Sequence, residues 1–210
     1  MSVYFYIFSF LIFFSGILFL FNVDKNEIVF QGILQILSSL ALLVTTYLTI
    51  KFQFKESFTE VMGIDFKNIK SYIITGILAT IVLVLFTTII NILSIFVFNN
   101  SFKNPYESFS PEKIRLISIF AILIAPIVEE VFFRGFIQPV FVKRFGMYIG
   151  IFTTSVIFGL SHSQYTNYST ALLSVIAIGI VLGIVKEKTG SIIPGILAHF
   201  INNFLAALVL

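Results

Sequence analysis

The sequence predicts an all-α fold, a polytopic membrane bundle of about seven transmembrane helices. Of its 210 residues, 58% are hydrophobic and only 11% are charged, and the mean hydropathy is +1.05. A soluble domain usually carries about a quarter charged residues. The apolar residues also fall into runs close to the roughly 20 residues that a helix needs to cross a bilayer. Composition and run length therefore both place the chain in a membrane.

Three apolar runs make up the N-terminal region, residues 1–110, which is predicted to be a scaffold of transmembrane helices. The runs cover residues 3–21, 28–50 and 72–98. The first run has neither a basic leading segment nor a small-residue cleavage site, so we expect a retained helix and not a signal peptide. A polar loop over residues 51–71 separates the second run from the third.

Four further runs make up residues 111–210, which we predict to be a separate four-helix core. The fourth run starts near Pro111, a residue type that suits the first turn of a helix, and continues to about Gln138. Pro139 is expected to end or kink this helix, because proline lacks the N–H group that a helix interior uses. The last three runs cover residues 147–162, 170–185 and 192–210.

Lysine and arginine in the short loops predict the orientation of the chain, since cytoplasmic loops carry an excess of these residues. One predicted side holds Lys51, Lys55, Lys67, Lys70, Lys143, Arg144, Lys186 and Lys188. The other side holds Lys25, Lys103, Lys113 and Arg115. We therefore expect the N-terminus in the cytoplasm, the C-terminus outside and the lipid bilayer as a partner. The net charge of +3 sits in these loops and does not indicate nucleic acid.

The charged and strongly polar residues inside the predicted spans are concentrated in the second half of the chain. A bilayer makes such groups costly, so each of them is a candidate functional residue. The candidates are Glu129, Glu130, Arg134, His162, His199 and Asn203, and they include both histidines of the chain. The first three runs contain no charged residue and no histidine. This asymmetry separates a predicted scaffold from a predicted site.

Helical spacing distinguishes the two adjacent glutamates. Glu130 and Arg134 are four residues apart and therefore neighbours on one helix face, so we predict an ion pair between them. Glu129 points to a different side of the helix and is not neutralised in this way. His199 and Asn203 are also four residues apart, so they share a face of the last helix.

Distance from the connecting turns predicts that these groups lie at a similar depth. At 1.5 Å per residue, Glu129 and His162 each lie roughly 25 Å along their helices from the turn near Phe145. By the same rise, Asn203 lies roughly 20 Å beyond the turn before its helix, with His199 one turn shallower. We therefore expect one layer in which a carboxylate, two imidazoles and an amide converge.

Such a set of groups supports hydrolysis of an acyl bond in one of two ways. Glutamate and histidine can hold a metal such as zinc. Alternatively, the glutamate can deprotonate a water molecule directly, while an imidazole and an amide donate hydrogen bonds to the developing oxyanion. The sequence has no His-Glu-x-x-His motif and no Gly-x-Ser-x-Gly motif. It has no cysteine, which excludes thiol catalysis and disulfides.

Three short motifs occur in order, in separate helices of the second region. They are Glu129-Glu130-x-x-x-Arg134, Phe158-x-x-x-His162 and His199-x-x-x-Asn203. Together they resemble the CPBP family, the CAAX-protease and bacteriocin-processing membrane proteins that are also called Abi. Ala125-Pro126 before the glutamates and Gly135 after them resemble the family as well. The likeness extends over residues 114–210.

The resemblance implies an intramembrane endopeptidase that acts on a membrane-associated peptide or protein. It implies that Glu129 activates the water with help from His162, that His199 and Asn203 stabilise the oxyanion, and that Glu130 and Arg134 hold the geometry. The better-understood members resemble glutamate-dependent enzymes that need no metal, so no tightly bound metal is expected, with a divalent ion such as zinc as the alternative. Bacteriocin maturation or self-immunity is the implied setting.

Two other classes of function compete with the peptidase. One is a non-catalytic bacteriocin immunity or partner-binding protein on the same fold. The other is a proton-coupled transporter, for which buried glutamate and histidine are equally typical. The sequence shows neither a repeat that relates its halves nor a matched pair of broken helices, which disfavours the transporter. The complete motif set disfavours a pure binding protein.

Overall fold

The computed structural model describes residues 28–98, 110–162 and 169–208, and all regular elements in these ranges are helices. The first predicted span, residues 3–21, lies outside them. By its internal contacts the chain divides into two units, residues 1–41 and 42–210, and every candidate site residue belongs to the second. The predicted all-α class is confirmed.

Three helical stretches of the described chain are long and apolar enough to cross a membrane. They are Gln35–Phe54, Phe58–Phe96 and Thr170–Thr189. Two further apolar helices, Met147–Ser161 and Ile193–Ala207, are shorter. A membrane-type helical fold is therefore supported, while the count of seven spans stays a prediction.

The predicted polar loop over residues 51–71 is mostly helical, so that expectation was wrong. Helix α2 (Ile28–Thr49) continues as the π-helix η1 (Ile50–Phe54), and the short helix α3 (Phe58–Met62) follows. The 3-10 turn η2 (Phe66–Asn68) then leads into the long helix α4 (Ile69–Phe98). In this stretch the apolar residues are interspersed with lysines. For that reason the sequence analysis predicted a polar loop and not packed helices.

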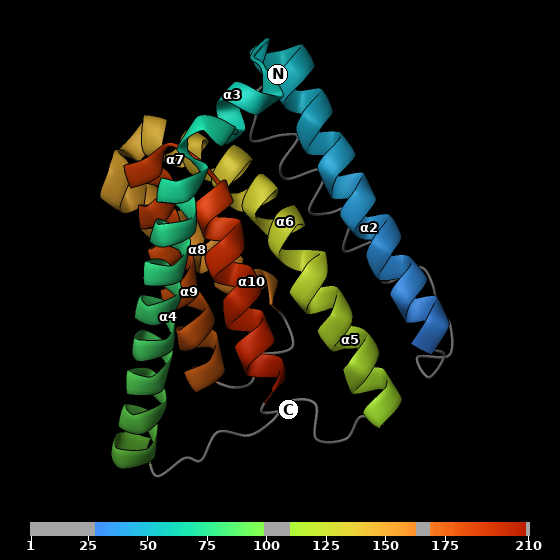
Figure 1. Cartoon of the computed structure of the whole chain (residues 1–210), viewed down its shortest axis with the longest axis vertical. Helices are drawn as coiled ribbons and strands as arrows, with labels where there is room; N and C mark the ends of the chain where they lie inside the picture. Colours follow the sequence, from blue (N-terminus) through green and yellow to red (C-terminus); the bar gives the residue numbers. More distant parts are fainter. Residues whose placement is uncertain (1–27, 99–109, 163–168, 209–210) are drawn as a thin grey trace. The chain divides into compact units, whose positions relative to one another are not determined.

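The predicted fourth helix is divided into four segments (Figure 1). They are α5 (Pro111–Leu123), α6 (Ala125–Glu129), the π-helix η3 (Glu130–Ile137) and α7 (Gln138–Phe145). Pro126 explains the break between α5 and α6, because it has no N–H group to donate to the carbonyl one turn earlier. Pro139 does not end the helix. It follows the wide turn in which the Gln138 N–H donates to Phe133, five residues back.

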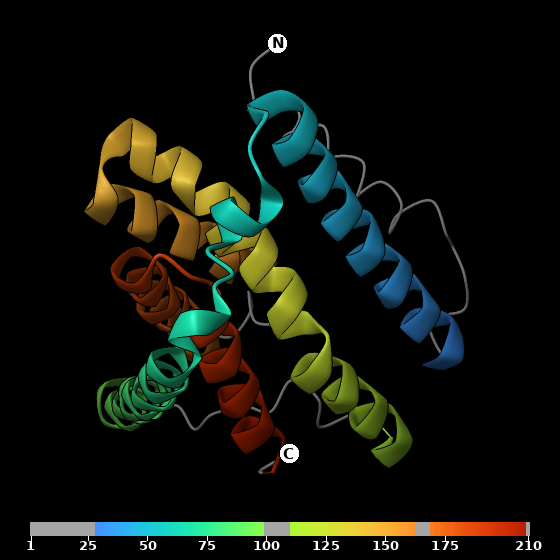
Figure 2. The same cartoon turned by 45° about the horizontal axis from the view of Figure 1, so that its top comes forward.

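Three helices complete the second unit: α8 (Met147–Ser161), α9 (Ser169–Thr189) and α10 (Ile193–Ala207). A tight turn at Gly146, whose φ is +82°, joins α7 to α8. After this turn α8 packs closely against α7, since a Cβ atom on Gly150 would lie 2.6 Å from the Val142 nitrogen. Figures 1 and 2 both show α4, α8, α9 and α10 gathered together, with α5 and α6 beside α10.

Helix α4 presents one packed face and one exposed apolar face. On the packed face, Ala79 and Leu83 contact Leu182 of α9 and Ala198 of α10 in a buried apolar cluster. On the other face, large side chains such as Ile74, Leu78 and Leu85 are more than half exposed. Exposed apolar residues on a helix of this length suit contact with lipid. The packed cluster supports α9 and α10, which carry part of the site.

Candidate active site

The predicted ion pair between Glu130 and Arg134 is present at the start of the π-helix η3. Glu130 Oε1 lies 3.0 Å from Arg134 Nη1, and both side chains are 0% exposed. The guanidinium also donates from Nη2 to the carbonyl of Gly179 in α9 at 3.2 Å. Its carbon lies 4.4 Å from the ring centre of Phe158. The buried charge is thus balanced by a carboxylate, a carbonyl and an aromatic face.

Glu129, the last residue of α6, lies beside both histidines. Its Oε2 is 3.8 Å from Nε2 of His162 and 3.7 Å from Nε2 of His199. Glu129 is 22% exposed and His162 is 18% exposed, whereas His199 is only 5% exposed. The three groups come from three different helices, and their meeting agrees with the shared depth expected from the helix rise.

His162 directly follows α8, and its ring is held from two sides. Nδ1 lies 2.8 Å from the carbonyl oxygen of Phe158, which can only accept a hydrogen bond. A proton on Nδ1 would be donated to this carbonyl, and Nε2 is the nitrogen that faces Glu129. The Phe158 ring also packs edge-on against the imidazole, with centroids 4.6 Å apart. The backbone and one aromatic ring thus hold the orientation of His162.

His199 contacts both glutamates, a relationship that the helical spacing did not predict. Nδ1 lies 3.4 Å from Glu130 Oε1, while Nε2 faces Glu129. Gly195, one turn earlier in α10, makes the approach possible, because a Cβ atom there would lie 2.8 Å from Glu130 Oε2. Gly195 was missed in the sequence, although it shares a helix face with His199 four residues later.

Asn203 does not join Glu129 and the two histidines. Its amide Nδ2 donates to the carbonyl of Ala121 in α5 at 2.9 Å, and its Oδ1 lies 3.4 Å from Nδ2 of Asn202. Among the described residues, no hydrogen bond joins Asn203 to Glu129. The packing of α10 on α5 turns this amide towards the α5 backbone, so its expected place beside Glu129 is not seen.

A second polar contact runs along α9, one turn beyond the ion pair. Gln138 Nε2 donates to the Gly183 carbonyl at 3.0 Å and to Glu187 Oε1 at 2.9 Å. Arg134 makes the same kind of contact with Gly179, four residues earlier on each helix. Glycine allows the side chains to reach this backbone, since a Cβ on Gly183 would lie 2.8 Å from Gln138 Oε1. The sequence analysis did not predict this contact, which the spacing of Gly179 and Gly183 four residues apart could have indicated.

Among the described residues, the donors are not grouped as in a known type of metal site. Structural and catalytic zinc sites need at least three nitrogen, oxygen or sulfur ligands arranged around one point. Within the described ranges, no group of three or more histidine, aspartate or glutamate side chains has such an arrangement. His199 Nδ1 instead faces Glu130, and His162 Nδ1 faces a carbonyl.

Comparison with known proteins gives one family and two bacterial relatives. Residues 111–205 match the family model for Rce1-like proteins, described as type II CAAX prenyl endopeptidases. An uncharacterized 24.3 kDa protein of Escherichia coli is 34% identical over 86 residues, which are 40% of this chain and 38% of that protein. The uncharacterized protein YpbD of Bacillus subtilis (strain 168) is 35% identical over 83 residues, 40% of each chain.

The similarity to these relatives covers only part of each protein. The aligned segment spans about two fifths of the length of each of the two curated relatives. No solved structure matches the chain. The matched segment nevertheless contains all the candidate site residues, from Glu129 to Asn203, and coincides with the region that resembles the CPBP family. Residues 111–205 of this chain are therefore similar to the Rce1-like family.

Proposed function

We propose that the protein is a membrane-embedded endopeptidase that hydrolyses a peptide bond in a membrane-associated peptide or protein. The observation that carries the proposal is the position of one carboxylate, Glu129, between the Nε2 atoms of His162 and His199 at 3.8 and 3.7 Å. The family match of residues 111–205 supports the same reaction class. The lipid bilayer and a peptide substrate are its partners, and nucleic acid is not.

The distances favour activation of a water molecule over direct contact between Glu129 and His162. A separation of 3.8 Å exceeds a hydrogen bond and suits two groups that share one water. Glu129 accepts a proton from this water while the water oxygen attacks the carbonyl carbon of the substrate. The Nε2 lone pair of His162 accepts the other hydrogen bond. When the C–N bond breaks, Glu129 returns the proton to the leaving amine.

His199 is assigned to the oxyanion that forms during the attack. Nδ1 of His199 faces Glu130 Oε1 at 3.4 Å, and Nε2 donates to the negatively charged oxygen when the imidazole carries both protons. Asn203 is the second donor implied by the family motif. Its amide takes part only after it leaves the Ala121 carbonyl to which it donates. Glu130 and Arg134 hold His199 and η3 in place.

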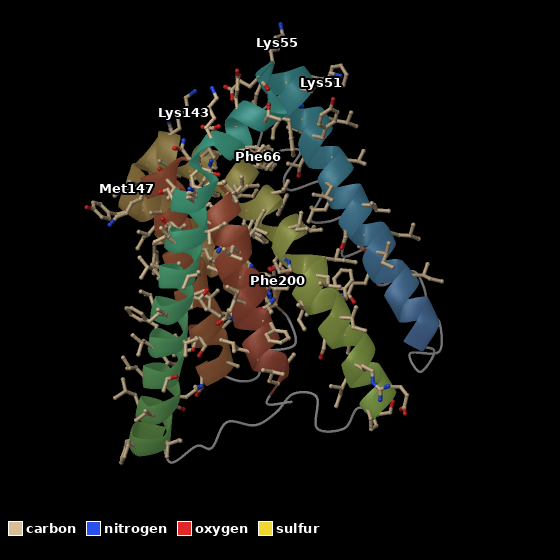
Figure 3. The ribbon with its side chains drawn as sticks, in the orientation of Figure 1. Lys51, Lys55, Phe66, Lys143, Met147 and Phe200 are labelled. Atoms are coloured by element: carbon tan, nitrogen blue, oxygen red, sulfur yellow. The ribbon has the colours of Figure 1, made fainter. Side chains whose placement is uncertain are left out.

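The membrane arrangement belongs to the same proposal. We place seven spans in the bilayer, with residues 1–110 as scaffold, residues 111–210 as catalytic core, the N-terminus in the cytoplasm and the C-terminus outside. In support, Lys51, Lys55 and Lys143 project at the end of the second unit where α3 and α7 lie (Figure 3). These lysines were assigned to one cytoplasmic side, as an excess of basic residues there requires.

The test replaces Glu129 with glutamine, which has nearly the same shape and cannot act as a base. Protein in lipid nanodiscs is incubated with vesicle-bound lipopeptides that end in a CAAX sequence, with and without a prenyl group. Mass spectrometry then measures the products. We expect cleavage by the wild type and a fall of about 10²–10⁴-fold for Glu129→Gln.

The matched control is Glu56→Gln, which changes an exposed carboxylate outside the site. It should cleave at the wild-type rate. Full activity in Glu129→Gln would remove Glu129 from the reaction. Failure of the wild type to cleave any peptide of the panel would overturn the endopeptidase proposal itself.

A further inference from the structure

Met62 of α3 lies outside the family-matched segment and yet is completely buried against the site's π-helix. Its exposure is 0%. A Cβ atom built on Gly135 would lie 2.1 Å from Met62 Sδ and 2.5 Å from Cε. The thioether therefore occupies the space that a side chain at position 135 would need. Gly135 directly follows Arg134, and the same Cβ position lies 3.8 Å from the carbonyl oxygen of Glu130.

Helix α3 is held in this position by the turn between α9 and α10. The N–H of Ile192 donates to the Met62 carbonyl at 3.0 Å. Lys186, only 8% exposed, donates from Nζ to the Val61 carbonyl at 3.1 Å and to the Gly190 carbonyl at 2.8 Å. These contacts hold the backbone of α3 beside the turn, from which the Met62 side chain reaches Gly135. Figure 1 shows α3 at the same end of the second unit as α7.

Gly63 completes the attachment. Its φ is +65°, and a Cβ atom there would lie 1.8 Å from the Gly190 carbonyl oxygen. No other residue type could bring the end of α3 so close to this turn without a rearrangement. Phe54 of the preceding π-helix η1 adds a ring contact to Phe136, with centroids 6.0 Å apart. Two consecutive residues of η3, Gly135 and Phe136, are thus packed by the connection between α2 and α4.

A π-helix needs such support from outside. Its i→i−5 turns are rare and occur mostly as single-turn bulges inside α-helices, often at functional sites. If the wide turn moved by one residue, the side chains within it would rotate by about 100° relative to the rest of the helix. Arg134 would then lose the Gly179 carbonyl, and Glu130 would lose His199. Glycine at 135 has no side chain of its own to resist that movement.

From these contacts we infer that Met62 is a positioning residue of the active site. It acts through Gly135 on the turn that carries Glu130 and Arg134, and through Glu130 on the imidazole of His199. Its effect on turnover rests on the proposed endopeptidase function. Its effect on the geometry of His199 does not depend on that function. The positioning role and the endopeptidase function can therefore be tested separately.

The kinetic arm uses a pair of complementary substitutions. Met62→Ala empties the space beside Gly135, and Gly135→Ala adds a methyl group into the space that Met62 fills. Each change alone should lower kcat at least about tenfold with KM within about twofold, since a misplaced group of the site costs roughly 1.4 kcal/mol or more. In the double variant the new methyl group occupies the vacated space, so most of the kcat should return. Met62→Leu, which conserves volume, should stay close to the wild type.

A matched control is Met147→Ala, which removes a methionine that is 41% exposed at the start of α8. It should leave kcat unchanged. If Met62→Ala keeps the wild-type kcat, or if the double variant is as impaired as the single ones, the inference is wrong. Should Met62→Ala fail to fold, Met62→Leu and the double variant still decide the outcome.

The spectroscopic arm needs no substrate. The chain has two histidines, so the ¹⁵N imidazole signals of His162 and His199 can be assigned from one histidine variant. Met62→Ala should shift the Nδ1 signal of His199, which faces Glu130, and leave that of His162, which faces a carbonyl. An unchanged His199 signal would overturn the inference. If the wild type cleaves nothing while His199 shifts as expected, the endopeptidase proposal fails and the positioning role stands.

Discussion

Oε1 of Glu130 lies 3.4 Å from Nδ1 of His199, so the buried ion pair reaches one of the two histidines beside Glu129. The same oxygen is 3.0 Å from Arg134 Nη1. Glu130 therefore links the guanidinium to the imidazole, and the two adjacent glutamates meet the same histidine from its two nitrogens. A change at Arg134 can reach the chemistry through this link without touching Glu129.

Replacement of Arg134 with methionine should destabilise the protein strongly. It leaves the carboxylate of Glu130 buried without its partner, which costs about 3–5 kcal/mol. Thermal or denaturant unfolding in detergent measures the effect, and Arg144→Met, at an exposed arginine of α7, is the matched control. The combined variant Glu130→Gln/Arg134→Met should regain part of the loss. Equal unfolding midpoints for Arg134→Met and the control would show that the pair is not buried as described.

A methyl group at position 195 should disturb the site more than the fold. In Gly195→Ala the new Cβ would lie 2.8 Å from Glu130 Oε2, so the carboxylate must shift and its contact with His199 must change. We expect peptide cleavage to fall at least about tenfold. Gly76→Ala is the comparison, because the three atoms nearest its new Cβ all belong to Leu197, which is not a candidate site residue. Similar activities for the two variants would contradict the role given to Gly195.

The contact between α7 and α9 should contribute measurably to stability. Gln138→Leu removes the hydrogen bonds to the Gly183 carbonyl and to Glu187 Oε1. A buried group left without its partner costs about 1–3 kcal/mol, so the free energy of unfolding should fall by that amount. Gln53→Leu, at an exposed glutamine, should change it by less than about 0.5 kcal/mol. A stability equal to that of the wild type would argue against this contact.

Chelators should not inhibit cleavage. The imidazole nitrogens that face Glu129 lie 3.7 and 3.8 Å from its Oε2, and the site uses this carboxylate directly as a base in the proposed reaction. Purified protein is treated with EDTA and with 1,10-phenanthroline, and its metal content and cleavage rate are measured. Loss of activity that zinc restores would instead assign Glu129 and the histidines to a metal.

The parts of the site that sequence could predict depend on local geometry. Glu130 and Arg134 pair because residues four apart are neighbours on any helix, and the wide turn of η3 does not undo this. Glu129 and His162 meet because a helix hairpin places residues that are equally far from its turn at one depth. Both arguments need only the rise of a helix and one turn, which the apolar runs already define.

The remaining parts depend on contacts between segments that are far apart in the chain. The π-helix could not be read from apolar spacing, because over eight residues its period differs little from that of an α-helix. Pro139 suggested instead that the helix would end or kink at this position. Asn203 was placed by its helix face alone, whereas the carbonyl of Ala121 determines where its amide points. Met62 lies in the stretch of residues 51–71, which was predicted to be a polar loop because of its lysines. Its burial was therefore not expected.

The pairing of Glu130 with Arg134 inside one turn also bears on how the chain is inserted as it is made. The segments that supply the Gly179 carbonyl and His199 are synthesised after η3. A single charge near the centre of an inserting helix costs about 2.5–3.5 kcal/mol. Two opposite charges one turn apart reduce that penalty before any later helix arrives. The pair of Glu130 and Arg134 can therefore enter the lipid phase as a nearly neutral unit before its later partners are made, while the charge of Glu129 remains.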